Sequence, residues 1–88
     1  MNIELILKEI IINLAFDNIS PEDINRDTDL KADLGIDSIT LVSVMIDIEE
    51  EFGITFESNV FDTYSMEKYG VILEQVTRLL TQKEGRHE

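Results

Sequence analysis

With 88 residues, the chain is long enough for one compact domain with a thin hydrophobic core and too short for two such domains. Its 19 acidic and 7 basic residues give a formal net charge of −12, which repels nucleic acid and anionic membrane surfaces and favours protein partners with basic patches. The chain contains no cysteine, which excludes disulfides, thiol nucleophiles and thiolate metal sites and is compatible with a reducing, cytoplasmic location.

The first predicted element is an amphipathic helix over residues 2–15, followed by a long polar loop. Apolar residues recur at helical spacing in the helix, while interspersed charges and the lack of a basic leader argue against a signal peptide or a membrane span. In the loop, over residues 17–35, the pair Ser20-Pro21 predicts a short helical turn. We expect four apolar side chains to anchor this loop to the core: Ile19, Ile24, Leu30 and Leu34.

A second helix is predicted to begin at Asp37 or Ser38 and to end at Phe52. Gly53 follows it and suits the left-handed conformation that commonly terminates a helix. The next segment contains β-branched and aromatic residues but is too short and broken for a strand, so we expect a short helical turn over residues 58–62.

A last helix is predicted from Met66 to Thr81, with Ser65 as its N-cap and apolar residues at helical spacing. The tail over residues 83–88 is polar, and we expect it to be frayed. Together these elements predict an all-α fold, a small four-helix bundle of three main helices and one short helix, in a single domain over residues 1–82.

The second helix carries two apolar faces. Successive residues lie about 100° apart around a helix axis, so five residues form one stripe suited to the core. These are Leu41, Val44, Met45, Ile48 and Phe52. A second stripe, Ile39, Val42 and Ile46, lies on a different face beside Ser43 and Glu50. It either packs beneath the preceding loop or stays partly exposed as a docking surface among acidic residues.

The chain offers few groups for catalysis. Its single histidine, His87, lies in the polar tail, and no glycine stands two residues beyond Ser38. Neither a serine–histidine pair nor a nucleophile elbow is therefore predicted. We expect no enzymatic activity of the chain's own.

One set of polar residues in the loop has the spacing of ligands in a calcium-binding loop: Asn25, Asp27, Asp29 and Asp33. Leu30 stands where such a loop requires glycine, and Ile36 stands where it requires glutamate. We interpret the spacing as chance alignment in an acidic loop, and we predict no metal site.

Ser38 stands where the loop meets the second helix, within the stretch DLGIDSIT. Unpaired backbone N–H groups and the positive end of the helix dipole favour an attached phosphate at such a position. Asp37 is the better helix cap of the two residues, which would leave Ser38 free to project outward. Two interpretations stay open on the residues alone: Ser38 only starts the helix, or it accepts an attached group.

The segments DLGIDSI and TLVSVMIDIEEEFGI resemble the core of the acyl carrier proteins. Members of that family share a serine motif of the D-S-L or D-S-I type at the start of their second helix, and an acidic helix ending with phenylalanine. Here the motif is Asp37-Ser38-Ile39, and the ending is Glu49-Glu50-Glu51-Phe52-Gly53. The similarity extends to the order of helices over most of the chain.

The resemblance implies that a phosphopantetheinyl transferase attaches 4′-phosphopantetheine from coenzyme A to Ser38. The terminal thiol of that arm would carry acyl groups as thioesters in fatty-acid, polyketide or other specialised biosynthesis. Partner enzymes, such as an activating enzyme, a ketosynthase or another acyltransferase, would use their own basic surfaces to dock on the carrier. The carrier itself is implied to be a monomer. The partner-binding residues implied are Asp37, Ile39, Val42, Ile46, Glu49 and Glu50.

The sequence departs from the fatty-acid carriers at two positions. Those proteins commonly have acidic residues where this chain has Thr40 and Ser43, which implies different partners and a specialised pathway. Peptidyl carriers usually show G-G-H-S or G-G-D-S, whereas this chain has G-I-D-S, which favours acyl cargo. Two alternatives stay open: an aminoacyl, peptidyl or D-alanyl carrier, and an acidic helical interaction module whose serine is never modified.

Overall fold

The computed structural model describes residues 2–15, 18–56 and 67–84. Within these ranges the chain forms α1 (Ile3–Leu14), the short 3-10 helix η1 (Pro21–Asp23), α2 (Ser38–Phe52) and α3 (Tyr69–Glu84). These described ranges contain no strand, only an isolated antiparallel bridge between Asp29 and Lys68. The predicted all-α fold is confirmed, whereas the short helical turn predicted over residues 58–62 lies outside the described residues.

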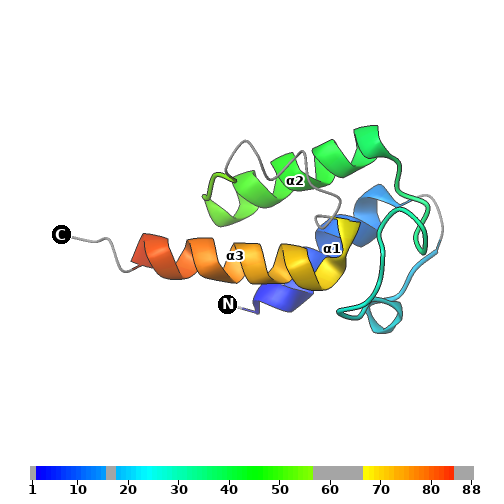
Figure 1. Ribbon diagram of the computed structural model, residues 1–88, viewed down its shortest axis with the longest axis horizontal. Coiled ribbons are helices and arrows are strands. Elements are labelled where there is room, and N and C mark those ends of the chain that lie inside the picture. Colours follow the sequence, from blue (N-terminus) through cyan, green and yellow to red (C-terminus); the bar gives the residue numbers. More distant parts are fainter. Residues whose placement is uncertain (1, 16–17, 57–66, 85–88) are drawn as a thin grey trace.

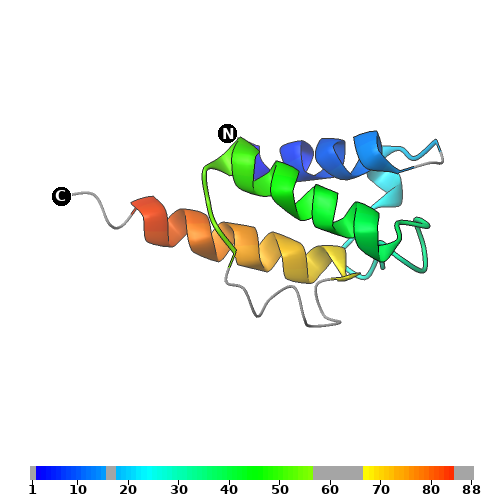
Figure 2. The same cartoon turned by 90° about the horizontal axis from the view of Figure 1, so that it is seen from above.

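The three long helices lie alongside one another, and α2 runs antiparallel to α1 (Figure 1). Figure 2 shows that α2 and α3 both start at the end of the molecule where the loop between α1 and α2 lies. Ser38, the first residue of α2, therefore lies at this loop end.

α1 is amphipathic, as predicted, and its ends are set by its caps. The Asn2 side chain is the N-cap and accepts a hydrogen bond from the Leu5 backbone N–H at 3.1 Å. Ala15 follows the helix as its C-cap. Within the helix, Leu7 and Ile11 are fully buried. The helix thus contains the predicted segment except for these two capping residues.

The loop between α1 and α2 is attached to the core by the side chains that the sequence indicated. Ile24, Leu30 and Leu34 are buried, and Ile19 packs partly buried against the same core. The predicted helical turn is η1, where the Ser20 backbone N–H donates to the Asp23 carboxylate at 3.0 Å. A long loop can be well defined in so small a domain because its apolar residues share the core with the helices.

α2 has the predicted bounds. Asp37 is its N-cap, and the Asp37 side chain accepts a hydrogen bond from the Thr40 backbone N–H at 2.8 Å. Gly53 ends the helix with φ of 65°, in the left-handed region that glycine adopts readily. The predicted core stripe is confirmed, with Leu41 partly buried and the other four residues buried: Val44, Met45, Ile48 and Phe52.

The predicted start of the last helix is wrong. α3 begins at Tyr69 and not at Met66, because the backbone just before it pairs with the loop instead of entering the helix. The Leu30 N–H donates to the Glu67 carbonyl at 2.7 Å, and the Tyr69 N–H donates to the Thr28 carbonyl at 2.9 Å. Ser65, the predicted cap, lies outside the described residues.

α3 also extends beyond its predicted end at Thr81, to Glu84. Lys83, which we placed in the polar tail, lies in its last turn and donates from Nζ to the carbonyls of Phe52 at 3.4 Å and Gly53 at 3.1 Å. A cation at the C-terminal end of α2 interacts favourably with that helix's dipole and unpaired carbonyls. The last turn of α3 is therefore tied to the end of α2.

Tyr69 connects α3 with α1. Its side chain is fully buried, and its hydroxyl donates a hydrogen bond to Glu4 Oε1 at 3.2 Å. Lys8 Nζ lies 5.7 Å from the centre of the Tyr69 ring, within the range of a cation–π contact. Burial, and then the neighbouring Glu4 carboxylate, raise the pKa of the Tyr69 hydroxyl, which therefore stays protonated as a donor.

Replacing Gly70 by alanine is expected to destabilise the protein by about 1–3 kcal/mol, the usual cost of overpacking. Glycine-to-alanine changes inside helices ordinarily stabilise by up to about 1 kcal/mol. Here a Cβ on Gly70 would lie 2.8 Å from the Arg26 carbonyl oxygen and 3.2 Å from Arg26 Cβ. Urea unfolding measures the effect, with Glu74→Ala on the exposed side of α3 as a control, and a gain in stability would contradict the close approach.

Candidate functional site

Ser38 is exposed at the first position of α2, and a different residue caps the helix. The Asp37 carboxylate accepts from the Thr40 N–H, and the Asp37 carbonyl accepts from the Leu41 N–H, each at 2.8 Å. The Ser38 hydroxyl makes no hydrogen bond with any other described residue. The structure thus removes the capping role that the sequence had left open for Ser38 and leaves its hydroxyl accessible.

The turn before α2 holds Ser38 on a fixed backbone. Gly35 adopts φ of 71°, and its N–H donates to the Lys31 carbonyl at 3.2 Å. The next residue, Ile36, is buried and donates from its N–H to the carbonyl of buried Leu30 at 2.9 Å. Because Leu30 and Ile36 are both in the core, they hold in place the start of the helix, which follows directly after them.

The Asp37 carboxyl has a pKa below its usual value, chiefly because of the backbone and side-chain hydrogen bonds from Thr40. A weaker backbone hydrogen bond from Ile39 and the charge of Lys31 act in the same direction. Hydrogen bonds to the ionised form favour that form, so the helix cap is strongest when Asp37 is charged.

Acidification is therefore expected to weaken the fold through Asp37. The stabilisation is fully present above the unfolded-state pKa, near 3.8, and is lost as the pH falls through the lower folded-state pKa. Asp37→Asn, which can still cap, should lose less stability between pH 5 and pH 2 than the native chain does. Thermal unfolding across this range measures it, with the exposed Asp47→Asn as control, and an unchanged pH dependence for Asp37→Asn would contradict it.

The second apolar stripe of α2 is exposed. Ile39 is 81% exposed, Val42 46% and Ile46 45%, although large apolar residues of this kind belong mostly to the core. The alternative that the loop covers them is wrong, because the loop buries its own anchors elsewhere in the core. Together with Ser38 and Ser43, which are also exposed, these residues form an uncharged surface over the first turns of α2.

The acidic residues of α2 lie in its second half, and they differ in exposure: three are exposed and one is partly buried. Asp47, Glu50 and Glu51 border a shallow depression of about 340 Å³ together with residues from the second half of α1. Glu49 is partly buried, and its Oε2 accepts a hydrogen bond from the Phe56 backbone N–H at 2.8 Å. Capping and periodicity signals do not reveal this contact, because it connects the helix with a segment beyond the Gly53 turn.

The polar residues that suggested a calcium loop have local roles in turns. Asn25 Oδ1 accepts from the Asp27 N–H, Asp29 Oδ1 accepts from the N–H groups of the residues that follow it, and Asp33 Oδ2 accepts from the Asp29 N–H, all at 2.8–2.9 Å. No group of three or more potential metal ligands occurs among residues 2–15, 18–56 and 67–84. Hydrogen bonding within the loop therefore explains the spacing.

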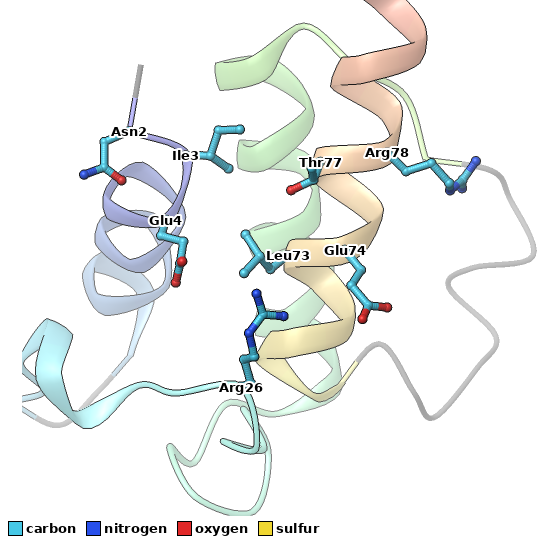
Figure 3. A pocket seen from close by; sticks show the side chains of 8 residues that line it. All are labelled: Asn2, Ile3, Glu4, Arg26, Leu73, Glu74, Thr77 and Arg78. Carbon is cyan, nitrogen blue, oxygen red and sulfur yellow. The ribbon is translucent and has the colours of Figure 1, made fainter.

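A separate open depression of about 840 Å³ lies between α1 and α3 (Figure 3). Leu73 and Arg26 point into the space between the two helices, with Ile3 and Glu4 on the α1 side. None of its lining residues comes from α2. This depression is therefore not part of the surface around Ser38.

Comparisons with known proteins agree with this geometry. The family model described as "Phosphopantetheine attachment site" matches residues 12–66, which include Ser38 and all of α2. "Nodulation protein F" from Rhizobium leguminosarum bv. viciae is 40% identical over 62 residues, covering 69% of this chain and 66% of that protein. The protein of the same name from Rhizobium leguminosarum bv. trifolii is 37% identical over 62 residues, with the same coverage of both chains.

The match extends through the loop and α2, the part of the fold where the exposed serine lies. In the described part of the chain, no helix combines the length and the apolar character needed to cross a bilayer. The chain therefore belongs to the acyl carrier protein family, whose cofactor is covalently attached 4′-phosphopantetheine.

Proposed function

We propose that Ser38 is the residue to which 4′-phosphopantetheine is attached. The observation that carries the proposal is the exposed Ser38 hydroxyl, which is free because Asp37 caps the helix. In the reaction, Ser38 Oγ forms a bond to the phosphorus of coenzyme A that bears the pantetheine. The hydroxyl proton passes to a base of the transferase, and adenosine 3′,5′-bisphosphate leaves.

The surroundings of Ser38 suit a phosphodiester. α2 has no acidic residue in its first turn, and the positive end of a helix dipole favours a negative group at this position. When bound, the arm supplies the terminal thiol on which acyl groups are held as thioesters, a chemistry that this cysteine-free chain otherwise lacks. The chain itself would then be a cytoplasmic substrate of several enzymes and not a catalyst.

The decisive experiment is intact-mass measurement of the native chain after incubation with coenzyme A and a phosphopantetheinyl transferase of broad specificity. The mass is expected to rise by one phosphopantetheine, and peptide mapping is expected to place the addition on Ser38. A folded protein that gains no mass would support an unmodified interaction module instead.

The exposed stripe supports a docking role for α2. We place the partner contact on Ile39, Val42 and Ile46, with Glu50 beside them, and the carboxylates of Asp37 and Glu49 add to the negative field. Short-range apolar contact and long-range attraction to basic surfaces favour fast, transient encounters. This is the behaviour that a carrier needs when it visits several enzymes in turn.

Ile46→Ala is expected to slow acyl loading of the modified chain by a partner enzyme about 5- to 30-fold, as the loss of roughly 1–2 kcal/mol of contact energy would do. Steady-state kinetics should show the change mainly in kcat/KM, while the unfolding free energy stays close to that of the native protein. The matched control is Leu5→Ala, which removes an equally exposed apolar side chain from α1. Equal kinetics for Ile46→Ala and the native chain would reject the docking surface.

The cargo is proposed to be an acyl group of a specialised pathway. The two relatives are named for nodulation, and the docking helix has hydroxyl groups at Thr40 and Ser43 where fatty-acid carriers commonly have acids. Incubating the modified chain with acyl- and aminoacyl-activating enzymes, followed by mass measurement, separates the two cargo classes. Formation of only the aminoacyl product would favour the aminoacyl or D-alanyl alternative.

A further inference from the structure

Lys31 and Ser38 lie at the two ends of one hydrogen-bonded turn. Lys31 directly follows Leu30, and Ser38 lies two residues after Ile36. Leu30 and Ile36 are both buried, and the Ile36 N–H donates to the Leu30 carbonyl at 2.9 Å. A core anchor at each end therefore sets the relative positions of the lysine and the serine.

The backbone of Lys31 is held on both sides. Its N–H donates to Asp29 Oδ1 at 2.9 Å, and its carbonyl accepts from the Gly35 N–H at 3.2 Å. Its side chain, in contrast, is 49% exposed, and Nζ lies 3.7 Å from Glu67 Oε2. A pair this long and this exposed contributes little to stability, so the ammonium group can exchange partners at low cost.

Lys31 is also the cation that acts on the start of α2. Its charge lowers the pKa of the Asp37 carboxyl, which directly precedes Ser38. The sequence contains no lysine or arginine from Ala32 through Glu67. The negative charge of a phosphodiester on Ser38 would therefore stand beside the Asp37 carboxylate, with Lys31 as the cation placed to offset it.

We infer that Lys31 is a positioning residue for the phosphodiester on Ser38, and that it leaves Glu67 to pair with the phosphate once the arm is attached. This inference rests on the proposed attachment at Ser38. Its structural consequence is that Glu67 loses its ion pair in the modified protein. The Glu67 carbonyl accepts from the Leu30 N–H. Attachment would therefore change the surroundings of Glu67 at the point where the loop is hydrogen-bonded to the segment before α3.

The experiment compares the unmodified and modified full-length chains, after intact mass has established how far modification has gone. In the native chain, attachment is expected to shift the NMR signals of the Lys31 side-chain ammonium and of the Glu67 carboxylate. The ³¹P resonance of the modified chain reports directly on the phosphate. It is expected to move in Lys31→Gln, to return towards the native position in Lys31→Arg, and to approach the Lys31→Gln position in 1 M salt, where the screening length is about 3 Å.

Lys68→Gln is the matched control, since it removes the same charge from the residue next to Glu67 and leaves in place Lys31, whose charge lowers the pKa of Asp37. Its ³¹P resonance is expected to stay at the native position. If the mass rises but Lys31→Gln and Lys68→Gln give the same ³¹P resonance as the native chain, the role of Lys31 is overturned while the attachment stands. If the mass does not rise on the folded native chain, the attachment at Ser38 and the role of Lys31 are both overturned.

Discussion

Ser38→Ala is expected to abolish phosphopantetheine attachment completely while leaving the protein folded. The substitution removes the hydroxyl oxygen that would form the bond to phosphorus, and the other hydroxyl of the first turn, on Thr40, is engaged by the Asp37 carboxylate. Folding should be unaffected because the cap belongs to Asp37. Alanine is even the better helix former, by roughly 0.5 kcal/mol.

Ser43→Ala is the control for this substitution. Ser43 is an exposed serine on the same helix, but it lies more than a turn away from the N-terminal end that favours phosphate. Intact mass after treatment with the transferase should show full modification of Ser43→Ala and none of Ser38→Ala. Circular dichroism and thermal unfolding of both variants then establish that the loss is chemical, and any remaining modification of Ser38→Ala would assign the attachment to another residue.

Phe52→Ala is expected to cost about 3–5 kcal/mol of unfolding free energy. Phe52 is the last residue of α2, its side chain is only 4% exposed, and it packs in the core shared by all three helices. Native domains have in total only about 5–15 kcal/mol of stability. The variant is therefore expected to be substantially unfolded at moderate temperature.

Ile46→Ala on the same helix provides the contrast. Its side chain is 45% exposed, and substitutions at surface positions usually change stability by no more than about 0.5 kcal/mol. Urea unfolding of the two variants beside the native chain measures the difference. Similar losses for Phe52→Ala and Ile46→Ala would show that the two faces of α2 have been assigned the wrong way round.

The sequence was sufficient to predict those parts of the fold that depend on residues close together along the chain. The Asp37 cap and the Gly53 turn are short-range signals, and both ends of α2 were predicted from them. The two stripes of α2 follow from helical periodicity, which separated buried Ile48 from exposed Ile39. The exposed position of Ser38, directly after the cap, follows from the same signals.

The predictions failed where distant segments meet. α3 starts at Tyr69 because backbone groups of the loop, more than thirty residues earlier, bond to the residues before it. The contacts of Glu49 with Phe56 and of Lys83 with Gly53 likewise join the end of α2 to later parts of the chain. Periodicity and capping signals contain no information about such contacts, because these depend on how the helices pack.

The two faces of α2 also affect how such a protein can change over generations. Selection for a folded protein acts on the buried stripe, whereas under the proposed docking role selection for partner choice would act on Ile39, Val42 and Ile46, whose side chains are exposed. Substitutions in the exposed stripe are little constrained by the need to keep the core, since surface changes have little effect on stability. If the proposed docking surface is the one that partners read, mutation or deliberate engineering at three positions would redirect this chain to a new set of enzymes without a new core having to evolve.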